Sequence, residues 1–155
     1  MKRLLLLAVT LTLVGLFALP VPAQQRGQMF TTQVTSPRIQ PGSVLGIKAV
    51  FADANNLPPL ASRDCYFLLG LVYDPRQYHT PFVLPPLLIG KAQFQLVRSP
   101  TGPQAVAGMR LPIPRMRLPA NFKLPLWVQG VAVVKDRNSR MHLMPAKPAM
   151  TVLVP

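Results

Sequence analysis

The sequence has a single cysteine, four aspartates and no glutamate in 155 residues. One cysteine forms no internal disulfide, so a hydrophobic core has to stabilise the fold without cross-links. We expect Cys65 to be a small buried residue on a strand, with a free thiol or a link between chains as the alternatives.

The scarcity of acids limits the chemistry available to the chain. Hydrolysis by paired carboxylates requires two acids within about 5–10 Å of each other. A hydrolase in which two acids converge is therefore an alternative here, but not the expected function. All four acids fall at expected turns or strand ends, where aspartate bonds the local backbone: Asp53, Asp64, Asp74 and Asp136.

Catalytic and metal-binding motifs are also missing. The sequence has no G-x-S-x-G elbow, no H-x-H, C-x-x-C or H-E-x-x-H pattern and no glycine-rich phosphate loop. Cys65 paired with His79 or His142 is the remaining arrangement for a nucleophile and base. Residues 53–56 (DANN) offer oxygen ligands, but Ca²⁺ takes about six to eight, so an Asx-type turn is expected. We predict no catalytic residues, no metal and no cofactor, and hence no enzyme.

Prolines are frequent in residues 24–155, so no long amphipathic helix is expected there. Short apolar or alternating runs occur instead, and they predict strands at 29–35, 43–51, 65–74, 91–98, 104–111, 126–136 and 149–155. The expected loops are 53–64, 74–86, 99–103 and 136–140. This pattern indicates an all-β fold, an antiparallel β-sandwich of about seven strands, immunoglobulin-like or jelly-roll-like.

Some strands carry sharper predictions. Residues 126–136 are apolar on both faces apart from Gln129, the one polar residue expected in the interior of that strand. Residues 91–98 (KAQFQLVR) alternate, which predicts one half-buried strand with these residues on one face: Ala92, Phe94 and Leu96. The strand at 43–51 likewise places its apolar residues together: Leu45, Ile47, Ala49 and Phe51.

The first residues have the pattern of an export signal. Lys2 and Arg3 precede an apolar run at 4–19, and residues 21–23 (VPA) provide a cleavage site. The alternative is a retained membrane anchor, but the run is shorter than the about 20 residues that span a bilayer. We expect a signal peptide at 1–23, cleaved near Ala23, and one domain at 24–155 that is secreted or periplasmic and has no transmembrane helix.

Cations are plentiful, since 17 Lys and Arg residues give the chain a formal net charge of +13. An exported protein with this charge is attracted to anionic material such as acidic polysaccharide, lipopolysaccharide, teichoic acid, a phospholipid surface or free nucleic acid. Export argues against genomic nucleic acid as a partner. Charge alone selects no partner, so a purely solubilising role is the alternative.

Residues 110–127 (RLPIPRMRLPANFKLPLW) combine four prolines and four cations with no acid. Because proline cannot donate to a sheet ladder, we interpret the stretch as an extended crossover between strands, and not as a free peptide ligand or a membrane-active peptide. Its apolar side chains are expected to face inward: Ile113, Met116, Leu118 and Phe122. Its cations and two from loop 136–140 form the predicted basic face for an anionic polymer: Arg110, Arg115, Arg117, Lys123, Arg137 and Arg140.

Aromatic residues near these cations are candidates for stacking on a sugar or a base. Tyr73 and Tyr78 share one loop with Arg76 and His79, and Trp127 follows the crossover. The alternative for Trp127 is packing in the core or at a sheet edge, since tryptophan is highly buried on average.

The order of several short motifs resembles a family of small secreted bacterial β-sandwich modules that are mostly uncharacterised. The matching features are Pro41-Gly42, the strand YFLLGLV, LIGKAQF, Ile113-Pro114 and LWVQGVAV. The resemblance covers about residues 40–155 and implies a β-sandwich without established catalytic residues. Such modules often accompany larger exported proteins.

The sequence thus predicts an exported, non-enzymatic β-sandwich with a structural or binding role at the cell envelope or outside the cell, contacting anionic polymers through a basic face. The expected partner is an anionic polysaccharide, an envelope surface or a secreted protein. With a protein partner, the module would add a sheet edge to that partner, and an exposed apolar strand at 149–154 would be the sign of it.

Overall fold

The computed structural model describes residues 30–155. The predicted signal peptide and its cleavage near Ala23 lie outside these residues. No helix in the described range is long and apolar enough to cross a membrane. Strands and loops make up nearly all of the described chain, which confirms the all-β class.

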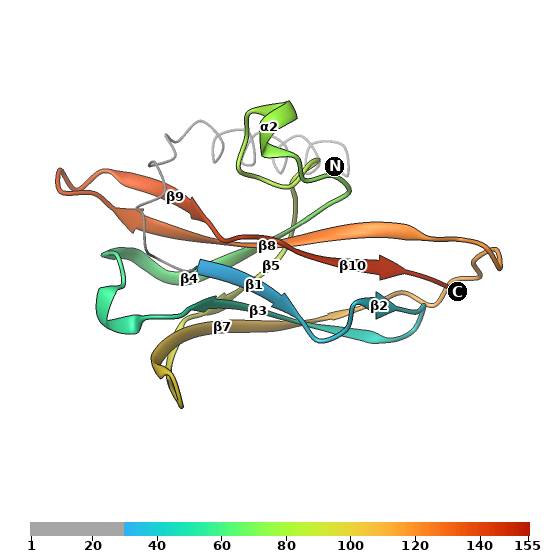
Figure 1. Ribbon diagram of the computed structural model, residues 1–155, viewed down its shortest axis with the longest axis horizontal. Coiled ribbons are helices and arrows are strands. Elements are labelled where there is room, and N and C mark those ends of the chain that lie inside the picture. The colour runs from blue at the N-terminus through green and yellow to red at the C-terminus, as the bar shows by residue number, and fades with distance from the viewer. Residues whose placement is uncertain (1–29) are drawn as a thin grey trace, which may run out of the picture.

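The strands form two sheets that lie face to face (Figure 1). The first sheet has four strands in the order β1-β3-β7-β6, and every neighbouring pair is antiparallel. These strands are β1 (Phe30–Val34), β3 (Val44–Phe51), β7 (Gly102–Pro112) and β6 (Gln95–Ser99).

The second sheet has six strands in the order β2-β10-β8-β4-β5, with β9 also paired to β8. Its β10 and β2 pair in parallel and the other pairs are antiparallel. These strands are β2 (Arg38–Ile39), β10 (Ala149–Leu153), β8 (Leu124–Lys135), β4 (Leu60–Gly70), β5 (Leu87–Gln93) and β9 (Met141–Pro145). Two short helices, η1 (Ala54–Asn56) and α2 (Pro75–Tyr78), lie in loops.

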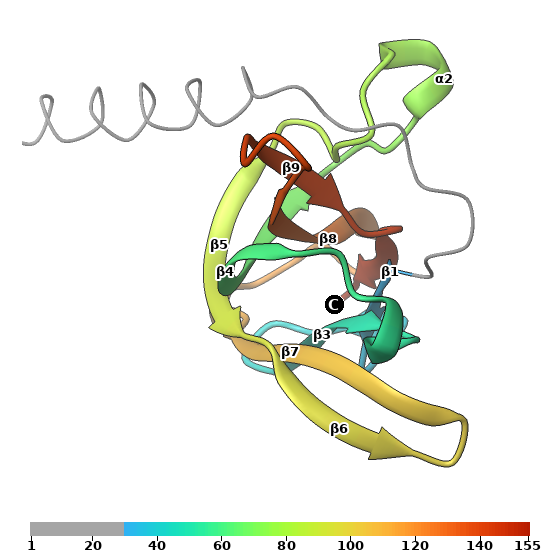
Figure 2. The ribbon, with the colours of Figure 1, turned by 90° about the vertical axis from the view of Figure 1, so that its left-hand side faces the viewer.

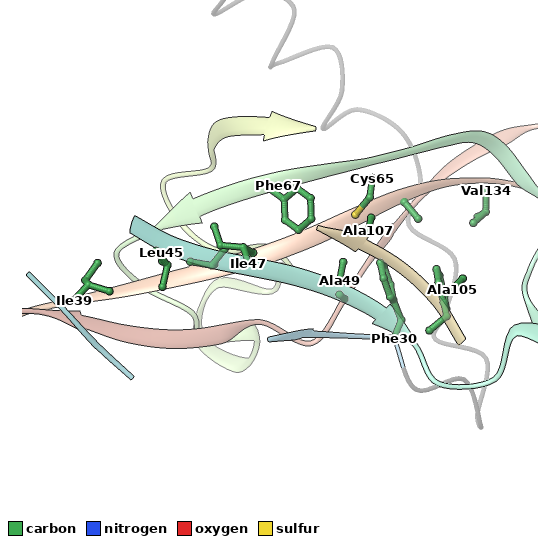
Figure 3. Packing of buried hydrophobic residues seen from close by; sticks show 14 of the residues in the cluster. Phe30, Ile39, Leu45, Ile47, Ala49, Cys65, Phe67, Ala105, Ala107 and Val134 are labelled. Carbon is green, nitrogen blue, oxygen red and sulfur yellow. The ribbon is translucent and has the colours of Figure 1, made fainter. Parts of the chain in front are cut away.

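The core between the sheets follows the alternation of β3. Its inward residues are buried, as predicted: Leu45, Ile47, Ala49 and Phe51. Cys65 and Phe67 of β4 belong to the same cluster and lie on the facing sheet (Figure 3). An added Cβ at Gly130 of β8 would lie 2.6 Å from the Cβ of Ala49, so the close approach of the two sheets leaves no room for a side chain there.

The six-stranded sheet also buries part of its outer face, which explains why β4 and β8 are apolar on both sides. Loop 71–86, which contains α2, covers this face (Figure 1) and completes a second cluster: Leu68, Phe82, Val83, Val131 and Leu143. The predicted interior position of Gln129 is confirmed, since it is fully buried beneath the loop. Its side-chain oxygen accepts from Val83 N (3.1 Å), and its amide donates to the carbonyls of Pro81 and Ala146 (2.8 Å each). Gln129 therefore ties the loop to the sheet.

The prediction of a single strand at 91–98 is wrong. The chain passes from the six-stranded to the four-stranded sheet at Phe94, whose backbone N–H donates to Arg63 O (2.8 Å). Ala92 and Phe94 are half-buried, but Leu96 is 76% exposed. The β6–β7 hairpin extends past the opposing sheet (Figure 2), and residues 95–98 of β6 are all exposed. The alternation runs through the corner and therefore does not reveal it.

The described residues form ten strands, not about seven. Strand β4 starts at Leu60, so part of the predicted loop 53–64 is strand and Asp64 lies within it. The sequence pattern does not predict β2, which has two residues, or β9 (MHLMP), which has no β-branched residue. The expected turn at 53–56 is present as η1, where the Asp53 side chain accepts from Asn55 N (3.0 Å).

Candidate functional site

Residues 113–123 join β7 of one sheet to β8 of the other, which confirms the predicted crossover. Backbone hydrogen bonds tie the crossover to the turn at 40–43, among them a long one from Gly42 N to Pro114 O (3.3 Å). Gly42 N donates to Ile113 O (3.0 Å), and Ile113 N donates to Ser43 O (2.8 Å). Both ends of the segment continue into strands, so its backbone is held in place before any ligand arrives.

The apolar side chains of the crossover divide into inward and outward groups. Ile113 is buried, and Leu118 and Phe122 are half-buried against the core, as predicted. Met116 is 45% exposed, so the prediction that it faces inward is wrong. A turn in which Phe122 N donates to Pro119 O (2.9 Å) brings Leu118 and Phe122 over this end of the core, which leaves Met116 in solvent.

Five exposed cations lie at this end of the fold, and we refer to them as the basic end: Arg38, Arg110, Arg115, Arg117 and Lys123. Arg38 of β2 pairs with Val152 of β10, and β10 pairs with the first residues of β8, directly after the crossover. Figure 1 shows β2, the crossover and the C-terminal residue at the same end of the molecule. Sequence analysis misses Arg38 because its position depends on the β2–β10 pairing, for which the sequence has no signal.

Arg115 shows how the basic end is packed. A Cβ added to Gly42 would lie 3.1 Å from the Cγ of Arg115, so the stem of this side chain lies against the turn. Gly42 also has a φ of +81°, a conformation that other residues rarely adopt. The turn thus combines a left-handed residue with a close contact, and both favour glycine. Arg115 as a residue is nevertheless exposed, as is common for a long charged side chain whose stem packs on the protein.

Acidic side chains in the described residues have local partners away from the basic end. Asp53 and Asp74 cap the short helices η1 and α2. Asp64 pairs with Lys91 (3.0 Å). The fourth, Asp136, lies in the β8–β9 hairpin. The four carboxylates therefore have structural roles, and none of the ion pairs found within residues 30–155 includes a cation of the basic end.

Arg137 and Arg140, which the sequence analysis grouped with the basic face, lie at the opposite end of the fold. The twelve residues of β8 separate them from Lys123, a distance of roughly 40 Å at the rise of an extended strand. In the hairpin, Asp136 accepts from the backbone N–H of Arg140 (2.8 Å) and pairs with His142 Nε2 (2.8 Å). The hydrogen bond with His142 is the main cause that lowers the pKa of Asp136. The six predicted residues thus do not form one face.

The candidate stacking residues are only partly brought together. The rings of Tyr73 and Trp127 lie 5.5 Å apart at an interplanar angle of 46°. Both rings are half-buried against the second cluster, and burial raises the pKa of Tyr73. This is the packing role that was the alternative for Trp127. Tyr78 is exposed in α2.

Cys65 lies in the core, as expected. Burial raises the pKa of its thiol to about 12, so the thiolate needed for nucleophilic chemistry is scarce at neutral pH. His79 is the exposed C-cap of α2. No cluster of three or more His, Cys, Asp or Glu side chains suited to a metal occurs in the part of the chain that the structure describes.

An exposed apolar strand at 149–154 was the feature that would favour a protein partner bound at a sheet edge. Strand β10 lies between β2 and β8, and β2 pairs with Val152 and Leu153, so the outer edge of β10 is covered in part. Exposed apolar side chains lie instead on two edge strands, on β6 at Leu96 and Val97 and on β5 at Leu87 and Leu88.

Comparisons with known proteins give no family for this chain. No protein-family model and no curated protein matches it. Among solved structures, it is similar to a superoxide reductase (neelaredoxin) from Ignicoccus hospitalis, with 8% identity and a TM-score of 0.38 over 83% of this chain and 84% of that chain. A likeness this distant supports no statement about activity. The resemblance to small secreted β-sandwich modules stays a prediction.

Proposed function

We propose that the protein is an exported, non-enzymatic β-sandwich module, immunoglobulin-like or jelly-roll-like, that attaches to anionic material at the cell envelope or outside the cell. The observation that carries this proposal is the basic end, where five exposed cations share one end of the fold without an acidic side chain beside them in the described residues.

Electrostatics explains why such a surface binds anions. Cations held close together by a fixed backbone repel one another, and an anionic ligand relieves this repulsion. The hydrogen bonds between the crossover and the turn at 40–43 fix the backbone, so little ordering is required on binding. The interaction is expected to weaken with salt, because exposed charges are screened beyond about 10 Å at 0.1 M ionic strength.

The structural roles of the acids and of Cys65 support a non-enzymatic role. The carboxylates cap helices, pair with a lysine or hold a hairpin. These arrangements serve the fold, and the chain's remaining nucleophile candidate is buried.

Retention on an anionic resin tests the proposal. The triple variant Arg110→Glu, Arg115→Glu, Arg117→Glu is expected to elute at low salt, whereas the parent protein requires moderate salt. The matched control makes the same charge change at three exposed arginines far from the basic end: Arg76→Glu, Arg98→Glu and Arg137→Glu. The control should keep most of the retention. Equal losses in both triples would mean that total charge matters and the basic end does not.

A further inference from the structure

The basic end carries exposed apolar side chains as well as cations. Met116, which is 45% exposed, stands between Arg115 and Arg117. Val44, which is 57% exposed, is the first residue of β3 and pairs with the exposed Pro112 at the end of β7. Further exposed prolines interrupt the crossover between its cations: Pro114 and Pro119.

This mixture of side chains suits one kind of anionic partner better than the others. A soluble polysaccharide offers charges and hydroxyl groups, and neither gains from contact with Met116 or Val44. A second copy of the chain that docked through its own basic end would place five cations against five. An anionic lipid surface offers phosphates for the cations and, a few ångströms deeper, an apolar layer for the side chains between them.

The order within the segment also fits an interface. Cations flank an apolar residue at 115–117, and all three residues are exposed. The long stems of arginine can cover apolar surface while their guanidinium groups remain at the level of the phosphates.

We propose that the basic end docks on an anionic phospholipid bilayer, with Met116 and Val44 entering the headgroup region and the five cations contacting lipid phosphates. The proposal rests on the proposed function and deepens it by naming the partner. Each cation near such a surface is expected to contribute about fivefold in affinity, and the two apolar side chains together about tenfold.

Vesicle binding with near-isosteric variants tests this. The variant Met116→Gln, Val44→Thr keeps size and charge and removes apolar character, and Met141→Gln, Val97→Thr makes the same changes at exposed positions outside the basic end. The parent protein should sediment with phosphatidylglycerol-containing vesicles and not with phosphatidylcholine vesicles. The first variant should lose about tenfold in vesicle affinity, whereas the control variant should bind vesicles like the parent protein. Retention on dextran sulfate should be unchanged in both variants.

The outcomes separate the two proposals. Retention on dextran sulfate that depends on the arginines, with no vesicle binding or with vesicle binding unaffected by Met116→Gln, Val44→Thr, overturns the lipid proposal and leaves the proposed function standing. If the parent protein binds neither vesicles nor dextran sulfate, both proposals are overturned.

A second measurement covers the case in which the double variant fails to fold. Met116→Cys is labelled with an environment-sensitive fluorophore, which spares the buried Cys65. Its emission should shift to the blue with anionic vesicles and not with dextran sulfate, whereas labelled Met141→Cys should not shift. An unchanged emission from the label at 116 on bound vesicles contradicts the proposal.

Discussion

The two ends of the fold have similar exposed side chains and differ in their balance of charge. The hairpin end has Arg137, Arg140 and an exposed Met141, much as the basic end has arginines around Met116. At the hairpin end Asp136 stands among the cations and bonds the backbone of Arg140. No acidic side chain occupies that place among the described residues of the basic end. Counting cations alone is therefore a poor guide, because the carboxylate of Asp136 offsets part of the positive charge at the hairpin end.

The backbones of the two ends are also held differently. The hairpin is closed by its own aspartate, which accepts from Asn138 N and Arg140 N (2.8 Å each). The crossover is held by a separate turn at 40–43 through backbone groups. These backbone bonds involve none of the side chains of the five cations, so their charged groups are left available for contact with a ligand.

The largest effect we expect concerns the middle of β8, between the two ends. Gln129→Leu leaves Val83 N and the carbonyls of Pro81 and Ala146 without their side-chain partner, so the free energy of unfolding should fall by about 3 kcal/mol. Denaturant unfolding measures this change. The control Gln95→Leu, at an exposed position on β6, should change stability by less than about 0.5 kcal/mol.

Retention of the folded Gln129→Leu variant sharpens the comparison of the two ends. Because the basic end is fixed by its own hydrogen bonds, this variant should elute from an anionic resin like the parent protein. Earlier elution of the folded variant would show that loop 71–86 belongs to the binding surface. A stability loss below about 1 kcal/mol would show that the bonds of Gln129 contribute little.

Gln129 also marks how far the fold could be predicted. Its interior position followed from the apolar residues around it, as did the inward face of β3. Its partners did not follow, because they lie in loop 71–86 and after β9, and no local pattern pairs distant segments. The same limit hid the corner at Phe94, where alternation continues while the chain changes sheets.

The candidate site was predictable in part for the same reason. Four of its cations lie within residues 110–123, so the composition of this one segment revealed them. Arg38 joins them only through the pairing of β2 with β10. The grouping with Arg137 and Arg140 was an avoidable error, because the strand predicted at 126–136 already separates those residues from Lys123 by its length.

A smaller effect is expected when the acid is removed from the hairpin end. Asp136→Asn keeps an oxygen to accept from Asn138 N and Arg140 N, and it leaves the cations of the hairpin without a negative neighbour. Affinity for an anionic resin should rise, by less than about fivefold, the contribution of one charge near an anionic surface. The salt concentration at elution measures this. An unchanged or earlier elution would indicate that the hairpin end has no access to the anion even without its acid.

The smallest expected effect is a pH dependence of stability at the hairpin end. The hydrogen bond with His142 and those with the backbone lower the pKa of Asp136 below its unfolded value of about 3.9. As the pH falls, Asp136 is protonated at a higher pH in the unfolded chain than in the folded protein. Its contribution to stability is therefore present above about pH 4 and is lost as the pH falls through the folded pKa. The difference in melting temperature between the parent protein and Asp136→Asn should therefore shrink as the pH falls below about pH 4. A difference that stays constant at the acid end would mean that the charge of Asp136 is not what distinguishes the hairpin end from the basic end.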